Sequence, residues 1–150
     1  MMQLSAHFSL AELTKSQVAL RRGLDNTPGE REIANLRRLT NGVLEPVRAR
    51  FSVPFSPSSG YRSPALNRLV GSHDGSQHLT GEAADFELPG VSNAEVARWI
   101  AAALEYDQLI LEFYEPDDPS SGWVHCSLKA VHNRRQTLTI SRAGVRLGLT

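Results

Sequence analysis

The feature that most constrains the fold is a pair of short segments, 76–85 and 123–127, which together contain two histidines and one aspartate. His78 and Asp85 stand seven residues apart, and His125 follows forty residues after Asp85. Two imidazoles and one carboxylate form the ligand set of a hydrolytic zinc site in which one coordination position stays open to water. The fold must bring both segments to one point for such a set to act.

The alternation of side chains along two predicted strands places these residues on a common surface. Successive side chains of a strand point to opposite faces, so Asp85 lies opposite the alternating apolar residues of segment 83–88. The same rule separates His125 from its apolar neighbours in a later strand, and a tight turn at Gly81 would bring His78 over the same point. We therefore expect three ligands at about 2.0 to 2.2 Å from a zinc ion.

Each of these residues also has an ordinary structural explanation when it is considered alone. His78 would be a loop histidine, His125 a sheet histidine with satisfied hydrogen bonds, and Asp85 a capping or turn carboxylate. The combination favours a metal, because a carboxylate inside an otherwise apolar strand needs a partner to offset its desolvation.

Length and composition predict one globular domain spanning residues 1–150. A chain of this length buries about two-thirds of the surface that its unfolded form exposes, and 41% of its residues are hydrophobic. Lys+Arg and Asp+Glu both number 16, and this zero net charge excludes the strong sequence-independent attraction typical of nucleic-acid binders. We therefore expect no nucleic-acid partner. The single cysteine, Cys126, excludes an internal disulfide.

Capping signals and hydrophobic periods place helices mainly in the first half of the chain and strands in the second. The first helix should begin after Ser9, with Glu12 completing a capping box, and the longest should begin at Pro28 and kink near Pro46. We therefore expect an α+β fold in which helices pack on one face of a small antiparallel sheet. The expected helices lie within 9–13, 28–47, 63–69 and 92–104, and the expected strands within 58–62, 83–88, 108–113, 122–128 and 136–141.

The metal-binding pattern resembles that of a known peptidase family. The M15 peptidases have a zinc signature similar to two parts of this chain, Ser76-x-His78-x-x-Gly81-x-Ala83-x-Asp85 and Trp123-x-His125. Segment 59–67 also resembles the part that precedes the zinc motif in this family, and the similarity spans residues 8 to about 128. The resemblance is to the D-alanyl-D-alanine carboxypeptidases and phage endolysin peptidases of the family, which cleave peptidoglycan peptides. It implies a fold like that of DD-peptidases and the hedgehog signalling domain, with His78, Asp85 and His125 as ligands of Zn²⁺.

Three further residues are candidates for contact with a substrate. By the resemblance, Arg62 stands where the family places an arginine near the substrate carbonyl or carboxylate, and a fixed guanidinium there would stabilise an oxyanion. Otherwise Arg62 would be a surface arginine paired with Asp74 or Glu82. Ser76 would support the site by hydrogen bonding, and Trp123 would either wall the cleft or fill it.

The general base is where the chain departs from the family pattern. Many relatives carry Glu or Asp three residues before the last histidine ligand, and this chain has Gly122 there. We expect Glu112 to act instead, because it is the carboxylate of an otherwise apolar strand, and burial beside zinc would tune it to accept and return a proton. Glu115, Asp117 and Asp118 in the following loop are the alternatives.

A cysteine nucleophile is the competing mechanism, because Cys126 directly follows His125. Strand alternation sends their side chains to opposite faces. Cys126 is therefore expected to be a small buried hydrophobic residue.

Together these observations predict zinc-dependent hydrolysis of an amide bond in peptidoglycan stem peptides by a monomer. The resemblance implies an endolysin-type D-Ala-D-Ala carboxypeptidase or an L-Ala-D-Glu endopeptidase, and the residues leave the choice open. The chain starts without the basic and apolar run of a secretory signal, and no window has the roughly 18 apolar residues that span a bilayer. We therefore expect cytoplasmic synthesis and access to the cell wall through a phage-made membrane lesion. The alternatives are a non-catalytic zinc-containing binding domain of the hedgehog type and a phage structural protein that retains the fold.

Overall fold

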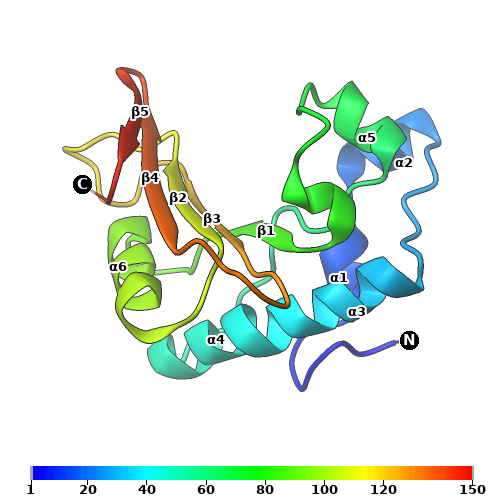
Figure 1. Ribbon diagram of the computed structural model, residues 1–150, viewed down its shortest axis with the longest axis horizontal. Helices are drawn as coiled ribbons and strands as arrows, with labels where there is room; N and C mark the ends of the chain where they lie inside the picture. Colours follow the sequence, from blue (N-terminus) through cyan, green and yellow to red (C-terminus); the bar gives the residue numbers. More distant parts are fainter. Residues whose placement is uncertain (1, 150) are drawn as a thin grey trace.

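The computed structural model describes residues 2–149 and has most of its helices in the first half of the chain and a β-sheet in the second (Figure 1). The expected α+β class is therefore confirmed. Before the first strand, the chain contains α1 (Leu10–Thr14), α2 (Gln17–Arg22), α3 (Glu30–Leu39), the π-helical segment η1 (Thr40–Leu44), α4 (Glu45–Phe51), α5 (Pro64–Leu69) and the 3₁₀-helix η2 (Gln77–Thr80). The second half contains β1 (Ala83–Phe86), α6 (Asn93–Ala103), β2 (Gln108–Glu112), β3 (Trp123–Ser127), β4 (Gln136–Ser141) and β5 (Gly144–Leu147). Within residues 2–149, no helix combines the length and the apolar character that a membrane crossing requires.

The five strands form one mixed sheet in the order β1-β3-β2-β4-β5. Neighbouring strands are antiparallel except β2 and β4, which are parallel. The expectation of a wholly antiparallel sheet is therefore wrong at this one pair. The reason lies in which strand edges are free for pairing. Because β1 and β2 occupy both edges of β3, β4 pairs with the free edge of β2. Because β4 runs opposite to β3, it runs parallel to β2.

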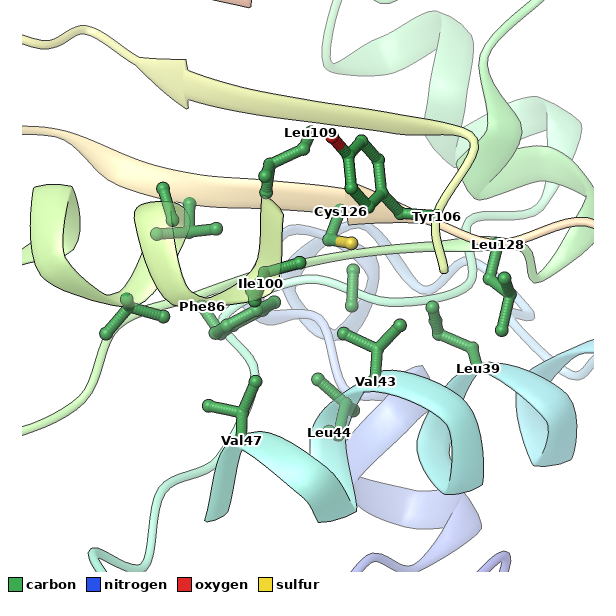
Figure 2. Packing of buried hydrophobic residues seen from close by; sticks show 14 of the residues in the cluster. Leu39, Val43, Leu44, Val47, Phe86, Ile100, Tyr106, Leu109, Cys126 and Leu128 are labelled. Atoms are coloured by element: carbon green, nitrogen blue, oxygen red, sulfur yellow. The ribbon is translucent and has the colours of Figure 1, made fainter. Parts of the chain in front are cut away.

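The sheet packs one face against helices. On this face, Phe86, Leu109 and Cys126 of the first three strands in the sheet meet Ile100 of α6 and Leu44 of η1 (Figure 2). All five side chains have at most 1% of their surface exposed. The residues that alternate with those on the strands point to the opposite face, which carries the charged side chains.

The longest helix runs from α3 through η1 into α4 (Figure 1). Its N-cap is Gly29 and not a residue before Pro28, because Glu32 accepts the Gly29 backbone N–H in the manner of a capping box. The π-helical turn η1 lies directly before Pro46, whose ring would clash with the carbonyl four residues earlier in a regular α-helix. The irregularity expected near Pro46 therefore takes the form of a wider turn.

Four segments differ from the expectations. Segment 58–62 forms a bridge and not a strand, with Ser58 and Ser59 hydrogen-bonded to the backbone of Asp85. The helices α2 and η2 and the strand β5 have no counterpart among the expected elements. All three are short, and every residue of β5 is exposed.

Replacement of Leu44 by alanine tests the packing beneath the sheet. Leu44 is fully buried, so Leu44→Ala should lower the free energy of unfolding by about 2 to 5 kcal/mol. Leu20→Ala is the matched control, because Leu20 is 75% exposed and its truncation should change the value by no more than about 0.5 kcal/mol. Urea unfolding of both variants measures the difference, and equal stabilities would contradict this core.

Candidate metal centre

His78, Asp85 and His125 form a cluster on the polar face of the sheet. Their ligand atoms all lie within 4.8 Å of one another. His78 Nε2 is 3.4 Å from Asp85 Oδ2, and His125 Nδ1 is 2.9 Å from Asp85 Oδ1. The two imidazole rings meet edge to face, with their centroids 5.2 Å apart. The structure thus brings together the three residues that the sequence nominates as metal ligands.

Strand register accounts for two of the three positions. Asp85 of β1 and His125 of β3 are direct antiparallel partners, so their side chains leave the sheet next to each other on one face. On the outer side of β1, the Asp85 carbonyl accepts the N–H of Ser58, and the Asp85 N–H donates to the carbonyl of Ser59. Both side chains therefore project from a backbone that is hydrogen-bonded on both sides.

The third position depends on the turn between η2 and β1. Gly81 ends η2 with a φ of 77°, a left-handed conformation that glycine adopts without strain. A Cβ at Gly81 would lie 2.6 Å from the carbonyl oxygen of Glu32 in α3, so a larger residue requires η2 to move. Ser76 caps η2 by accepting the backbone N–H of His78. This turn lets the chain double back so that His78 reaches the cluster.

One hydrogen bond sets the orientation of the His78 ring. Its Nδ1 lies 2.6 Å from the carbonyl oxygen of Gly60. Because a carbonyl only accepts, Nδ1 donates its proton there, and the lone pair of Nε2 remains for the cluster. Metal-binding histidines usually have such a partner on the second ring nitrogen.

The neighbours of Asp85 keep it ionised. Burial raises the pKa of Asp85, but the hydrogen bond from His125 and the adjacent imidazole of His78 lower it by more, so the pKa lies below its usual range. The carboxylate is therefore charged at neutral pH and can accept a cation.

The donor set fits zinc. Two imidazole nitrogens and one carboxylate oxygen leave the fourth position of a tetrahedral site open. Ligands about 2.0 to 2.2 Å from a tetrahedral metal lie about 3.3 to 3.6 Å from one another. The 3.4 Å between His78 and Asp85 falls in this range, whereas the 2.9 Å between His125 and Asp85 is a hydrogen-bond distance. The cluster can hold a metal ion once that hydrogen bond gives way to it.

The cluster lies in a cleft with a volume of about 640 Å³. Ser76 and Trp123 line this cleft, as does Arg62. The Trp123 ring packs against Phe113, with the ring centroids 5.0 Å apart. Trp123 is therefore part of a wall of the cleft, which was one of the two expectations for it.

Arg62 is fixed by two side chains at the same cleft. Its Nε donates to Asn67 Oδ1 at 3.2 Å, and its Nη2 donates to Ser76 Oγ at 3.4 Å. These contacts replace the alternative pairing with Asp74 or Glu82. Burial lowers the pKa of Arg62, while nearby carboxylates act in the opposite direction. An arginine keeps its charge at any working pH, so the cleft contains a positively charged guanidinium fixed by hydrogen bonds.

The comparison with known families agrees with this geometry. A family model described as Peptidase M15 matches residues 6–127. The chain belongs to the M15 peptidase family. Peptidases of this family depend on zinc, which agrees with the donor set, and all three clustered residues lie within the matched range. A search of curated proteins found no match.

Glu112 is the carboxylate next to the cluster in this M15 peptidase. Its Oε1 lies 3.8 Å from His125 Nδ1, and its side chain lines the cleft. Burial raises the pKa of Glu112 and the charge of Asp85 raises it further, while His125 and Arg62 only partly oppose them. Glu112 therefore holds a proton more readily than an exposed glutamate does.

The three loop carboxylates considered as alternatives lie away from the cleft. In the part of the chain that the structure describes, none of Glu115, Asp117 and Asp118 lines it. Glu115 instead pairs with Arg142 at 3.6 Å.

The M15 peptidase has no room for an acid at position 122. Gly122 has a φ of 64°, and a Cβ there would collide with the backbone carbonyl of Glu112. The close approach of the loop to β2 therefore leaves no space for a side chain at this position.

Cys126 lies outside the site, as alternation predicts. Its side chain is fully buried in the core on the other face of the sheet (Figure 2). Burial raises the pKa of this thiol well above its ordinary value, so it remains protonated.

Two features of the site are missing from the sequence-based prediction. One is the Gly60 carbonyl that orients His78, which no sequence signal marks. The other is Asp107, a fully buried carboxylate that accepts a hydrogen bond from Gln77 in η2. Asp107 directly precedes an apolar strand. A carboxylate buried there needs a partner to offset its desolvation, as Asp85 does, and this is the signal in the sequence that could have identified it.

Removal of one clustered histidine tests metal binding. His78→Ala should weaken zinc binding by at least about 100-fold, because it removes a ligand and not merely a neighbour of one. His73→Ala is the matched control, since His73 lines the same cleft and lies outside the cluster. Competition with a fluorescent chelator measures both affinities. Zinc bound equally well by the two variants would show that the cluster does not hold the metal.

Proposed function

We propose that this M15 peptidase hydrolyses an amide bond in the stem peptides of bacterial peptidoglycan, with Zn²⁺ held by His78, Asp85 and His125. The observation that carries the proposal is the composition of one cleft, which contains the cluster, the carboxylate of Glu112 and the guanidinium of Arg62. A metal site, a base and a fixed cation are the parts that amide hydrolysis uses.

Glu112 is the proposed general base and general acid. Zinc, when bound, acidifies a water molecule and polarises the carbonyl under attack. Glu112 lies beside His125, takes up the proton that the attacking water loses, and delivers it to the amine when the carbon–nitrogen bond breaks. Its raised pKa supports this role, because a proton acceptor works best with a pKa closer to the working pH.

Arg62 is proposed to stabilise the negative charge that develops on the carbonyl oxygen. Its contacts with Asn67 and Ser76 hold the guanidinium in place, so little reorganisation is needed during the reaction. Ser76 and Trp123 border the space that the peptide would occupy and are the proposed substrate contacts.

A second cavity of about 260 Å³ adjoins the cleft and shares Arg62 and Val70 with it. Both candidate bonds stay within the proposal: the terminal D-Ala-D-Ala bond, cut by a carboxypeptidase, and the L-Ala-D-Glu bond, cut by an endopeptidase. The masses of released fragments distinguish them.

The competing proposals are a non-catalytic zinc-binding domain of the hedgehog type and a phage structural protein. Their main support is the missing acid at Gly122. The carboxylate of Glu112 beside the cluster weakens that support and favours the peptidase. We also propose that the enzyme acts as a monomeric endolysin, which reaches the cell wall through a membrane lesion.

Replacement of Glu112 by glutamine separates catalysis from metal binding. Glu112→Gln keeps the shape of the side chain and removes the base, so turnover should fall by about 10² to 10⁴-fold while zinc stays bound. Mass spectrometry of fragments released from purified peptidoglycan measures turnover, with and without a chelator.

Glu115→Gln is the matched control, because this glutamate lies outside the cleft and its change should leave the rate within about twofold. A zinc-loaded wild-type protein that releases no fragments would favour the binding-domain alternative. Full activity of Glu112→Gln would instead remove Glu112 from the mechanism.

A further inference from the structure

The buried carboxylate of Asp107 and the half-exposed guanidinium of Arg134, which lines the cleft, form an ion pair that we call the anchor. Asp107 has no exposed surface. It accepts hydrogen bonds from the backbone N–H of Arg134 at 2.9 Å and from the guanidinium, the shortest being Nη2 to Oδ2 at 2.7 Å. Burial raises the pKa of Asp107, but the bonds from Arg134 and Gln77 lower it to about 2. The anchor is therefore a charged and fully hydrogen-bonded pair at any working pH.

The backbone of Asp107 is fixed as firmly as its side chain. Its N–H donates to the carbonyl of Ser127, at the end of β3, at 2.8 Å. Its own carbonyl accepts the N–H of Gln136, at the start of β4, at 3.0 Å. The carboxylate is therefore held between two strands and cannot follow the movements of a loop.

Gln77 connects this anchor to the metal cluster. Its Nε2 donates to Asp107 Oδ2 at 2.9 Å. Gln77 is the first residue of η2 and directly precedes His78, which comes from a 3₁₀-helix of four residues and not from a sheet strand. The other two clustered residues stand on strands, so His78 is the ligand whose position depends most on outside support.

We propose that Gln77, held by the Asp107–Arg134 pair, is a positioning residue that fixes η2 and thereby sets the zinc affinity of His78. Arg134 lies beyond residues 6–127, which the family model matches, so the segment after the match contributes to the metal site. The inference rests on the proposed role of His78 as a ligand and does not depend on which bond, or whether any bond, is hydrolysed.

Gln77→Met tests the proposal with little change in side-chain size. It removes the hydrogen bond to Asp107 and leaves the Asp107–Arg134 pair intact. Zinc affinity, measured by chelator competition, should fall by about 10-fold to 100-fold, the range typical of lost partners behind a metal ligand. The unfolding midpoint of the metal-free variant should stay close to that of the metal-free wild type. If Gln77 had a merely structural role, its replacement would instead lower this midpoint and leave the zinc affinity unchanged.

Arg134→Lys and Arg135→Ala complete the experiment. Lysine cannot reproduce the forked contact with Asp107, so Arg134→Lys should also weaken zinc binding. Arg135 donates to the carbonyls of Leu104 and Ala101 and has no contact with η2, so Arg135→Ala should leave the affinity unchanged. Wild-type affinity in Gln77→Met, or an equal loss in Arg135→Ala, would overturn the proposal. Weakened zinc binding in Gln77→Met together with a wild-type protein that cleaves nothing would uphold it and reject the proposed peptidase activity.

Discussion

The pairing of Asp85 with His125 across β1 and β3 is the constraint on which the site depends. It places an ionised carboxylate on a largely buried surface, where desolvation is unfavourable unless partners offset it. The surrounding structure supplies those partners. His78 arrives on η2, the carbonyl of Gly60 fixes its ring, and Gly81 provides the turn that makes the approach possible. Segments that are far apart in the sequence thus meet at the buried carboxylate of Asp85.

A comparison of two buried carboxylates explains why a cation fits at one of them. Asp107 is hydrogen-bonded directly to the guanidinium of Arg134. The ion pairs of Asp85 within residues 2–149 involve only His78 and His125. Within these residues no guanidinium or ammonium group bonds Asp85 directly, in contrast to Asp107. A divalent metal ion would satisfy this carboxylate and the ring nitrogens at once.

The sequence predicts the parts of this structure that depend on local pattern. Alternation along β1 and β3 places Asp85 and His125 on one face, and the capping residue Ser9 marks a helix at its observed position. The sequence does not predict the parallel pairing of β2 with β4, because this depends on which strand edge is free after β1 has paired. The link from Gln77 to Asp107 is also hidden, since it joins residues thirty positions apart with no periodic pattern between them.

Gly122 stands where the backbone leaves no space for a side chain. The loop before β3 approaches β2 so closely that a side chain at position 122 would meet the carbonyl of Glu112. In the sheet, Glu112 is the register partner of Trp123, which directly follows that glycine and stands two residues before His125. A carboxylate on a strand is held more firmly than one on a loop, and this fixes its distance from the clustered ligands. The carboxylate of Glu112, the proposed base, therefore lies on a neighbouring strand of the same sheet, beside the cluster.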